Sequence, residues 1–167
     1  NDKLIIRKCL DKHETLNFLR ANGIEVPAHG LVGEGKMPSR YPVIAKPRSS
    51  QGSKGLRKVT SLSNLKNFPI GFVWQDYLIP DSQEYTCAVY VTKNLSKRIL
   101  VLKRLLIGSY TGKGSVVNIP EITQYIEKIA EIFKKPGCFN IQLRLTAEGP
   151  RLFEINPRLS STLVFRD

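Results

Sequence analysis

Polar and apolar side chains alternate in the stretch FNIQLRLTAEGPRLFEINPR, residues 139–158, on both sides of a turn at AEGP. Three polar residues occupy every second position of its second half: Glu154, Asn156 and Arg158. Successive side chains of a β-strand point to opposite faces, so these polar groups are expected to share one face, with Phe153 and Ile155 on the other. The first half predicts a similar strand, with three polar residues on one face: Asn140, Gln142 and Arg144.

Pairing of these two strands as a hairpin would place Gln142 opposite or diagonal to Glu154. Side-chain oxygens from Gln142, Glu154 and Asn156 would then converge on a small volume. Such oxygen ligands suit Mg²⁺, which is commonly held by one or two carboxylates together with substrate phosphates. Arg158, at the end of the strand, would hold an anion beside that volume. The alternative is the solvated outer face of an edge hairpin, and these residues alone leave both interpretations open.

A second candidate site lies in the segment YPVIAKPRSSQGSKG, residues 41–55. Lys46 stands inside an apolar strand, where burial of an ammonium group is costly unless an anion accompanies it. The loop RSSQGSKG follows directly, and its small residues allow backbone amides to approach phosphate oxygens closely. The loop lacks the GxxxxGK[ST] pattern of a P-loop, and so does GSYTGKGS at residues 108–115. Taken alone, RSSQGSKG is also compatible with an ordinary hairpin loop.

The composition is typical of a globular protein, with 41% hydrophobic residues among 167, which is enough for one domain or two small lobes. No apolar run approaches the ~18 residues that a membrane span requires. Cys9, Cys87 and Cys138 show no CxxC spacing, which argues against a zinc site or a disulfide framework and favours a cytoplasmic protein. The net charge of +12 indicates anionic ligands. Because the basic residues are scattered, no specific nucleic-acid partner is expected.

The hydrophobic periodicity predicts an α+β fold without the regular alternation of a doubly wound sheet. Three helices are expected, at residues 11–22, 61–67 and 121–135. The first is predicted to begin with Asp11 as its cap and to end before Gly23. Residues 28–40 and 108–115 are expected to be loops. Seven strands are expected, at residues 41–47, 55–60, 71–78, 84–91, 98–106, 138–146 and 151–156.

In this order the segments resemble an ATP-grasp domain, most closely the subgroup of the carbamoyl phosphate synthetase large subunit. Nearly the whole chain takes part, through DKHETLNFLRANGIEVP, YPVIAKPRSSQGSKGL, WQDYLIPDSQEYT, KRLLIGSYTGKGS, FNIQLRL and LFEINPRLSST. The resemblance implies two α+β lobes with a nucleotide site between them. Residues 1–10 are expected to be a tail from a missing preceding domain, 11–74 a lid lobe with the phosphate-binding loop, and 75–167 a truncated C-terminal lobe with the metal site.

The resemblance also implies roles for individual residues around ATP. Lys12 and Lys46 would bind the phosphates, and Glu84 stands where the family has a carboxylate that binds the ribose. The flexible loop over the β- and γ-phosphates would contain five of the residues between 49 and 55: Ser49, Ser50, Gly52, Ser53 and Gly55. The hinge at the adenine would be formed by four consecutive residues: Gln75, Asp76, Tyr77 and Leu78.

The metal ligands implied by the family are Gln142, Glu154 and Asn156, binding Mg²⁺ with Mn²⁺ as an alternative ion. Arg158 would face the reacting acyl phosphate, and Arg104 matches a less uniform basic position nearby. These two arginines are therefore the expected catalytic residues.

The implied function is that of an ATP-dependent ligase that joins a small-molecule carboxylate to an amine or related nucleophile through an acyl phosphate. The fragment alone is expected to be inactive in ligation, because the family forms part of the substrate pocket from a preceding domain. A homo-oligomer is compatible with the sequence, and no membrane association is expected. Two alternatives remain, a non-catalytic or regulatory nucleotide-binding module and, less favoured, a basic nucleic-acid-binding domain.

Overall fold

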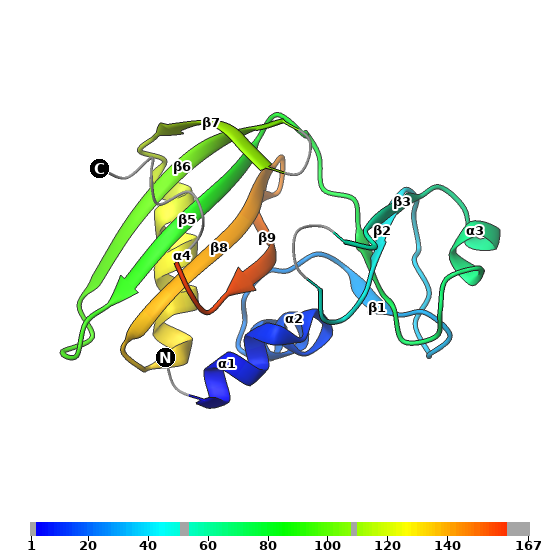
Figure 1. Ribbon diagram of the computed structural model, residues 1–167, viewed down its shortest axis with the longest axis horizontal. Helices are drawn as coiled ribbons and strands as arrows, with labels where there is room; N and C mark the ends of the chain where they lie inside the picture. The colour runs from blue at the N-terminus through cyan, green and yellow to red at the C-terminus, as the bar shows by residue number, and fades with distance from the viewer. Residues whose placement is uncertain (1–2, 51–53, 108–109, 160–167) are drawn as a thin grey trace.

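The computed structural model describes residues 3–50, 54–107 and 110–159, which form two antiparallel sheets beside each other (Figure 1). The smaller sheet has the order β1-β4-β2-β3, with β1 at His29–Leu31, β2 at Val43–Lys46, β3 at Arg57–Val59 and β4 at Val73–Asp76. The larger has the order β7-β6-β5-β8-β9, with β5 at Glu84–Val91, β6 at Lys97–Ile107, β7 at Tyr110–Val116, β8 at Gly137–Thr146 and β9 at Gly149–Asn156. Residues 77–83 join β4 to β5, and the expected hinge at residues 75–78 spans the end of β4 and the start of this connection.

Four helices complete the α+β fold that the sequence predicts: α1 at Lys3–Leu10, α2 at Lys12–Ala21, α3 at Leu62–Lys66 and α4 at Pro120–Phe133. The α2 helix begins as expected, because Asp11 Oδ1 accepts hydrogen bonds from the backbone amides of His13 (2.9 Å) and Glu14 (3.1 Å). It ends at Ala21, shortly before Gly23, whose φ of +76° is a conformation that glycine adopts without strain.

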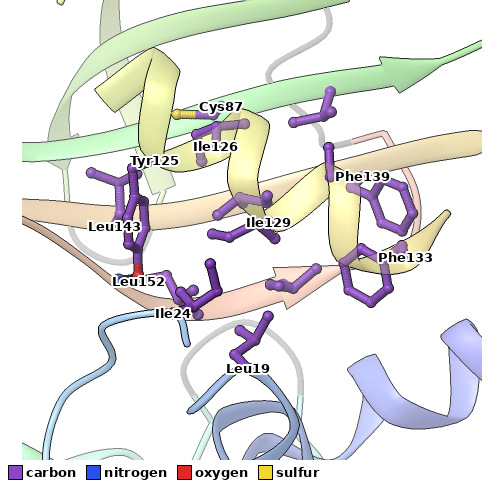
Figure 2. Packing of buried hydrophobic residues seen from close by; sticks show 14 of the residues in the cluster. Leu19, Ile24, Cys87, Tyr125, Ile126, Ile129, Phe133, Phe139, Leu143 and Leu152 are labelled. Carbon is purple, nitrogen blue, oxygen red and sulfur yellow. Dashed lines mark hydrogen bonds between the residues drawn. The ribbon is translucent and has the colours of Figure 1, made fainter. Parts of the chain in front are cut away.

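The main core lies between α4 and one face of the larger sheet (Figure 2). Ile122, Ile126 and Ile129 recur at helical spacing on α4, and each is fully buried. Figure 2 shows the α4 side chains packed over Phe139, Leu143 and Leu152 of the sheet. Leu19 of α2 belongs to the same cluster and lies beyond the edge strand β9. The smaller sheet has its own cluster, which includes Val43, Ala45, Leu65 and Trp74. The polar face of the larger sheet is therefore the one that remains for a site.

The start of the chain packs against the main core. Residues 3–10 form a helix, with Ile5 and Cys9 buried in that core, and the expectation that they belong to a preceding domain stays a prediction. The α2 helix also packs into this core, although it was grouped with the lid lobe. The expected domain ranges 11–74 and 75–167 remain predictions, and the boundary between them falls within β4.

Two segments that were expected to be loops contain strands. β1 lies within residues 28–40 and pairs with β4, and β7, which begins within residues 108–115 and ends at Val116, pairs with β6. Both are edge strands. β1 pairs with a strand far along the chain, whereas β7 pairs with β6, which directly precedes it, and its small and polar composition gave no sign of a strand. Within the described ranges no helix is long and apolar enough to cross a membrane.

Candidate functional site

A cavity of about 370 Å³ lies between the two sheets and is bordered by the hinge. Its walls come from α2, from β2, β3 and β4 of the smaller sheet, and from β5, β6, β8 and β9 of the larger one. It brings together most of the residues that the sequence singled out: Lys12, Lys46, Ser50, Gln75, Asp76, Tyr77, Leu78, Glu84, Arg104, Gln142 and Glu154. We call this cavity the cleft.

The polar row at the end of the chain forms as expected, but with an irregularity that the sequence did not reveal. Gln142 pairs with Glu154 across β8 and β9, whereas Leu143 pairs with Leu152. Phe153 is therefore an extra residue in β9, a β-bulge. The bulge lets both Leu152 and Ile155 enter the core, each at most 2% exposed. The expectation that Phe153 lies on the core face was wrong, because the bulge turns it to the cleft.

Glu154 is the carboxylate of this row and stands between two amide side chains. Asn156 Nδ2 donates to Glu154 Oε1 over 3.3 Å. Gln142 lies opposite Glu154 in the pairing of β8 with β9. No group of three or more His, Cys, Asp or Glu side chains suited to a metal lies in the part of the chain that is described. A donor set of one carboxylate and two amides fits Mg²⁺, which takes its remaining oxygens from water and phosphates.

Lys46 faces the row from the opposite sheet and is almost completely buried, at 4% exposure. Its Nζ donates to the carbonyl oxygen of Phe153 over 3.1 Å. Burial lowers the pKa of Lys46 to about 7, although Glu154 raises this pKa and Lys12 lowers it further. A buried ammonium whose hydrogen-bond acceptor is a neutral carbonyl is a site that an anionic ligand would stabilise.

Lys12 opens α2 and reaches the loop that follows β2. Its Nζ donates to both the carbonyl and the hydroxyl oxygen of Ser50, each over 3.1 Å. Burial lowers the pKa of Lys12, and the nearby carboxylates of Glu154 and Asp11 raise it. Arg48 fixes the start of the loop, because its Nε donates to Asp11 Oδ2 over 2.8 Å. The helix and the loop thus hold Lys12 beside Lys46 and Glu154.

The remaining loop residues fall into two groups. Gly52 and Ser53 lie outside the described residues. Gly55 has a φ of +76°, and a Cβ atom there would lie 3.0 Å from the Pro47 ring, so this position favours glycine on two counts. Gly55 does not line the cleft.

The hinge side of the cleft presents a buried amide. Gln75 is 3% exposed, and its Oε1 has no hydrogen-bond partner among the described residues. A buried acceptor of this kind is costly unless a ligand donates to it, and an exocyclic amine of a base would do so. The Asp76 carboxylate already forms an ion pair, because Arg40 donates to its Oδ2 from Nε (2.9 Å) and Nη2 (2.6 Å).

Glu84 also lines the cleft and is bound by two arginines. Arg104 Nε donates to Oε1 over 2.8 Å, Arg104 Nη2 lies 2.7 Å from the same oxygen in an ion pair, and Arg144 Nη2 donates to Oε2 over 3.0 Å. Arg144 was not among the residues expected in the site. Its alternation with Gln142 placed it on the polar face, but nothing in the sequence indicated which acidic residue it would meet.

A smaller cavity of about 170 Å³ adjoins the cleft along β9. Lys12, Ser50, Phe153 and Glu154 line both cavities, so the two meet at the polar row. This smaller cavity, called the side pocket below, holds three expected residues that do not line the cleft: Ser49, Asn156 and Arg158. Arg158 is exposed, and its Nη1 donates to the Leu159 carbonyl oxygen over 3.0 Å.

Two antiparallel sheets with a nucleotide-sized cleft between them, lysines on one side and a carboxylate–amide row on the other, define an ATP-grasp domain. Residues 74–166 match a protein-family model described as "ATP-grasp in the biosynthetic pathway with Ter operon". This match covers more than half of the sequence, and the chain belongs to that family. No match was found among curated protein sequences.

Solved structures share this fold at low sequence identity. N5-carboxyaminoimidazole synthetase from Staphylococcus aureus, complexed with ADP, has a TM-score of 0.78 at 18% identity, covering 95% of this chain and 47% of its own. The corresponding synthase from Aspergillus clavatus, complexed with ATP, has a TM-score of 0.75 at 16% identity, covering 93% and 46%. L-amino acid ligase from Bacillus licheniformis has 0.72 at 17% identity, covering 95% and 42%. The chain thus spans less than half the length of these relatives.

Proposed function

We propose that this chain is the MgATP-binding part of a ligase that activates a carboxylate as an acyl phosphate and transfers the acyl group to an amine or related nucleophile. One observation carries the proposal. The buried ammonium of Lys46 and the neighbouring Lys12 face Glu154 across the cleft, so cations for a polyphosphate and a ligand for its metal ion share one volume. The ADP and ATP complexes of the structural relatives support a nucleotide as the ligand.

In this proposal the lysines neutralise and orient the phosphates, while Gln75 accepts a hydrogen bond from the adenine amine. Glu154, Gln142 and Asn156 would hold Mg²⁺, which supplies charge neutralisation at the transferred phosphoryl group. The carboxylate oxygen of the acid attacks the γ-phosphorus, and ADP leaves. The amine then attacks the acyl carbon, inorganic phosphate leaves, and the amine loses a proton. Positioning and electrostatics supply most of the catalysis in such a transfer.

The side pocket favours a ligase over a module that only binds nucleotide. It opens onto the polar row where the γ-phosphate would lie, and Arg158 is available there to hold an acid or its phosphate. A pocket of about 150 Å³ holds a group the size of benzene, so a small acid fits in 170 Å³. A regulatory module would need the cleft but not this second compartment.

The test is an ADP-release assay of the protein in its natural length, with Mg²⁺, ATP and a panel of small carboxylates and amines. A ligase gives ADP release that depends on one acid and on one amine, with formation of the corresponding amide. Calorimetric binding of MgATP without any acid-dependent turnover would favour the regulatory module. Failure to bind MgATP would contradict both.

Several further features belong to the same proposal. A preceding domain would complete the substrate pocket, and alone this chain would ligate poorly. The motifs FNIQ and FEINPR support the carbamoyl phosphate synthetase large-subunit subgroup. A cytoplasmic location, and Mn²⁺ as an alternative ion, belong to the same proposal.

A further inference from the structure

The side pocket has a polar part and an apolar part. Lys12, Ser50 and Glu154 line both this pocket and the cleft, so the polar part is the one that meets the polar row. Among the lining residues that the pocket does not share with the cleft, six are apolar: Cys9, Leu10, Leu16, Leu152, Ile155 and Pro157. Four of the six belong to the main core and are at most 7% exposed, so packing fixes this apolar wall.

The apolar wall offers little to a polar substituent. Thr15 also lines the pocket, but its hydroxyl already contacts the carbonyl oxygens of Lys8 (2.6 Å) and Asp11 (2.8 Å). A single hydroxyl proton serves these two acceptors, so Thr15 has no donor left for a ligand. The part of an acid that extends along this wall would therefore be bound mainly by apolar contact.

The charged groups of the side pocket already have partners in the proposed function. Lys12 binds phosphates, Arg158 holds the reacting carboxylate or its phosphate, and Glu154 binds the metal ion. In the described part of the lining, Glu154 is the one acidic residue. A second carboxylate on the acid would lie against the apolar wall, where an unpaired charge is costly. An ammonium next to the reacting carboxylate would face the two cations and the metal ion.

We infer that the acid is a monocarboxylate with an uncharged, apolar chain, of about four to six carbon atoms in all. This inference rests on the proposed function, because it assumes that the side pocket receives the acid. The pocket has a volume of about 170 Å³, slightly more than the roughly 150 Å³ that holds benzene. Each further methylene group buried against the wall should raise kcat/KM about fourfold until the pocket is filled.

The experiment is an assay of the protein in its natural length with MgATP, hydroxylamine and a series of acids. The carboxylate of the acid attacks the γ-phosphorus and ADP leaves. The nitrogen of hydroxylamine then attacks the acyl carbon, inorganic phosphate leaves and a proton is lost, which gives a hydroxamate that is measured directly. We expect kcat/KM to rise from acetate through propionate and butyrate to valerate. Succinate should be at least ~100-fold poorer than butyrate, which has the same number of carbons, and alanine should be poorer than propionate.

The outcomes separate this inference from the proposed function. The highest kcat/KM for succinate, for alanine or for acetate would overturn the inference and leave the ligase in place. Hydroxamate from none of the acids, although calorimetry shows that MgATP binds, would overturn the proposed function and the inference with it.

Leu10 offers a variant that should change the choice of acid. It lines the side pocket but not the cleft and is 52% exposed, so Leu10→Arg does not bury a new charge. The guanidinium would pair with the second carboxylate of succinate. The ratio of kcat/KM for succinate to that for butyrate should therefore rise at least tenfold, with MgATP affinity unchanged. An unchanged ratio would place the chain of the acid elsewhere and overturn the inference.

Leu62→Arg is the matched control, because it makes the same substitution on the other side of the molecule. Leu62 is 41% exposed at the start of α3 and lines neither the cleft nor the side pocket. This variant should leave the ratio for the two acids unchanged. A rise in Leu62→Arg equal to that in Leu10→Arg would show that added positive charge alone favours succinate, which would also overturn the inference.

Discussion

Lys46 Nζ in the smaller sheet and the Phe153 carbonyl oxygen in the larger sheet are joined by a hydrogen bond of 3.1 Å. The acceptor belongs to the bulged residue that precedes Glu154, so the bond connects the two sides of the cleft beside the polar row. This hydrogen bond therefore holds Lys46 of β2 close to Glu154 of β9, the lysine and the carboxylate on which the proposed function depends.

Lys46→Met should stabilise the nucleotide-free protein at neutral pH and weaken MgATP binding at least tenfold. The folded protein holds the pKa of Lys46 near 7, well below the ordinary value of 10.5. Between these values the unfolded chain binds more protons, so the lysine makes stability rise with pH. The variant should be roughly 1–3 kcal/mol more stable at pH 7, with a weaker rise toward pH 10. Urea unfolding measures this, with exposed Lys128→Met as the control.

If Lys46→Met left both the stability and the nucleotide affinity unchanged, burial of the ammonium would cost the folded protein no stability and the ligand would not contact it. Lys128 should show neither effect, because it lies on the exposed side of α4.

Glu154→Gln should remove most of the gain in ATP affinity that Mg²⁺ provides, because the row then loses its carboxylate. We expect at least a tenfold loss for MgATP and a similar loss for MnATP, with thermal unfolding nearly unchanged. Titrations with and without the metal ion separate this from a loss of nucleotide binding itself. Glu148→Gln, in an exposed turn, serves as the control. Equal metal dependence in Glu154→Gln and the wild-type protein would place the ion elsewhere.

The nucleotide-free protein should lose stability as the pH falls from 6.5 to 4, in part through His29. Burial lowers the pKa of His29 to about 4, a hydrogen bond to Pro27 raises it, and Arg20, His13 and Lys36 lower it. The unfolded chain binds more protons in this window, so stability increases with pH. We expect His29→Gln to reduce the loss by roughly 1–2 kcal/mol in unfolding experiments across this range.

Carboxylates also titrate between pH 4 and 6.5, so the informative quantity is the difference between His29→Gln and the wild-type protein. Parallel curves for the two proteins would contradict the assignment.

Ile129→Ala should destabilise the protein by about 2–4 kcal/mol, because it leaves a cavity between α4 and the larger sheet. Ile129 is fully buried in the main core (Figure 2). Urea denaturation measures the effect, and Glu127→Ala on the exposed side of the same helix should change stability by less than about 0.5 kcal/mol. MgATP affinity measured well below the unfolding temperature should be the same in both variants.

The parts of the molecule that local periodicity specifies agree with the sequence-based expectation. The α+β class, the capped α2 helix, the apolar face of α4 and the pairing of Gln142 with Glu154 all follow from side-chain alternation or helical spacing. Lys46 was singled out because a charge inside an apolar strand needs a reason, and the structure buries it as expected.

Features that depend on distant partners could not be read from the sequence. β1 has only three residues and pairs with β4, which lies far along the chain. α1 has only eight residues, too few to be stable alone, and forms against the core through Ile5 and Cys9. The pairing of Arg104 and Arg144 with Glu84 joins three strands that alternation alone cannot place in register.

The bulge at Phe153 has a consequence for how this hairpin tolerates change. In a regular strand a slip of one residue exchanges the two faces along its whole length. Here Leu152 and Glu154 lie on opposite sides of a position where one residue is already unpaired. A shift that starts at the turn after Thr146 can be absorbed there and need not reach the polar row. The half of the hairpin near the turn can therefore vary in length and packing while the half that carries the row keeps its register.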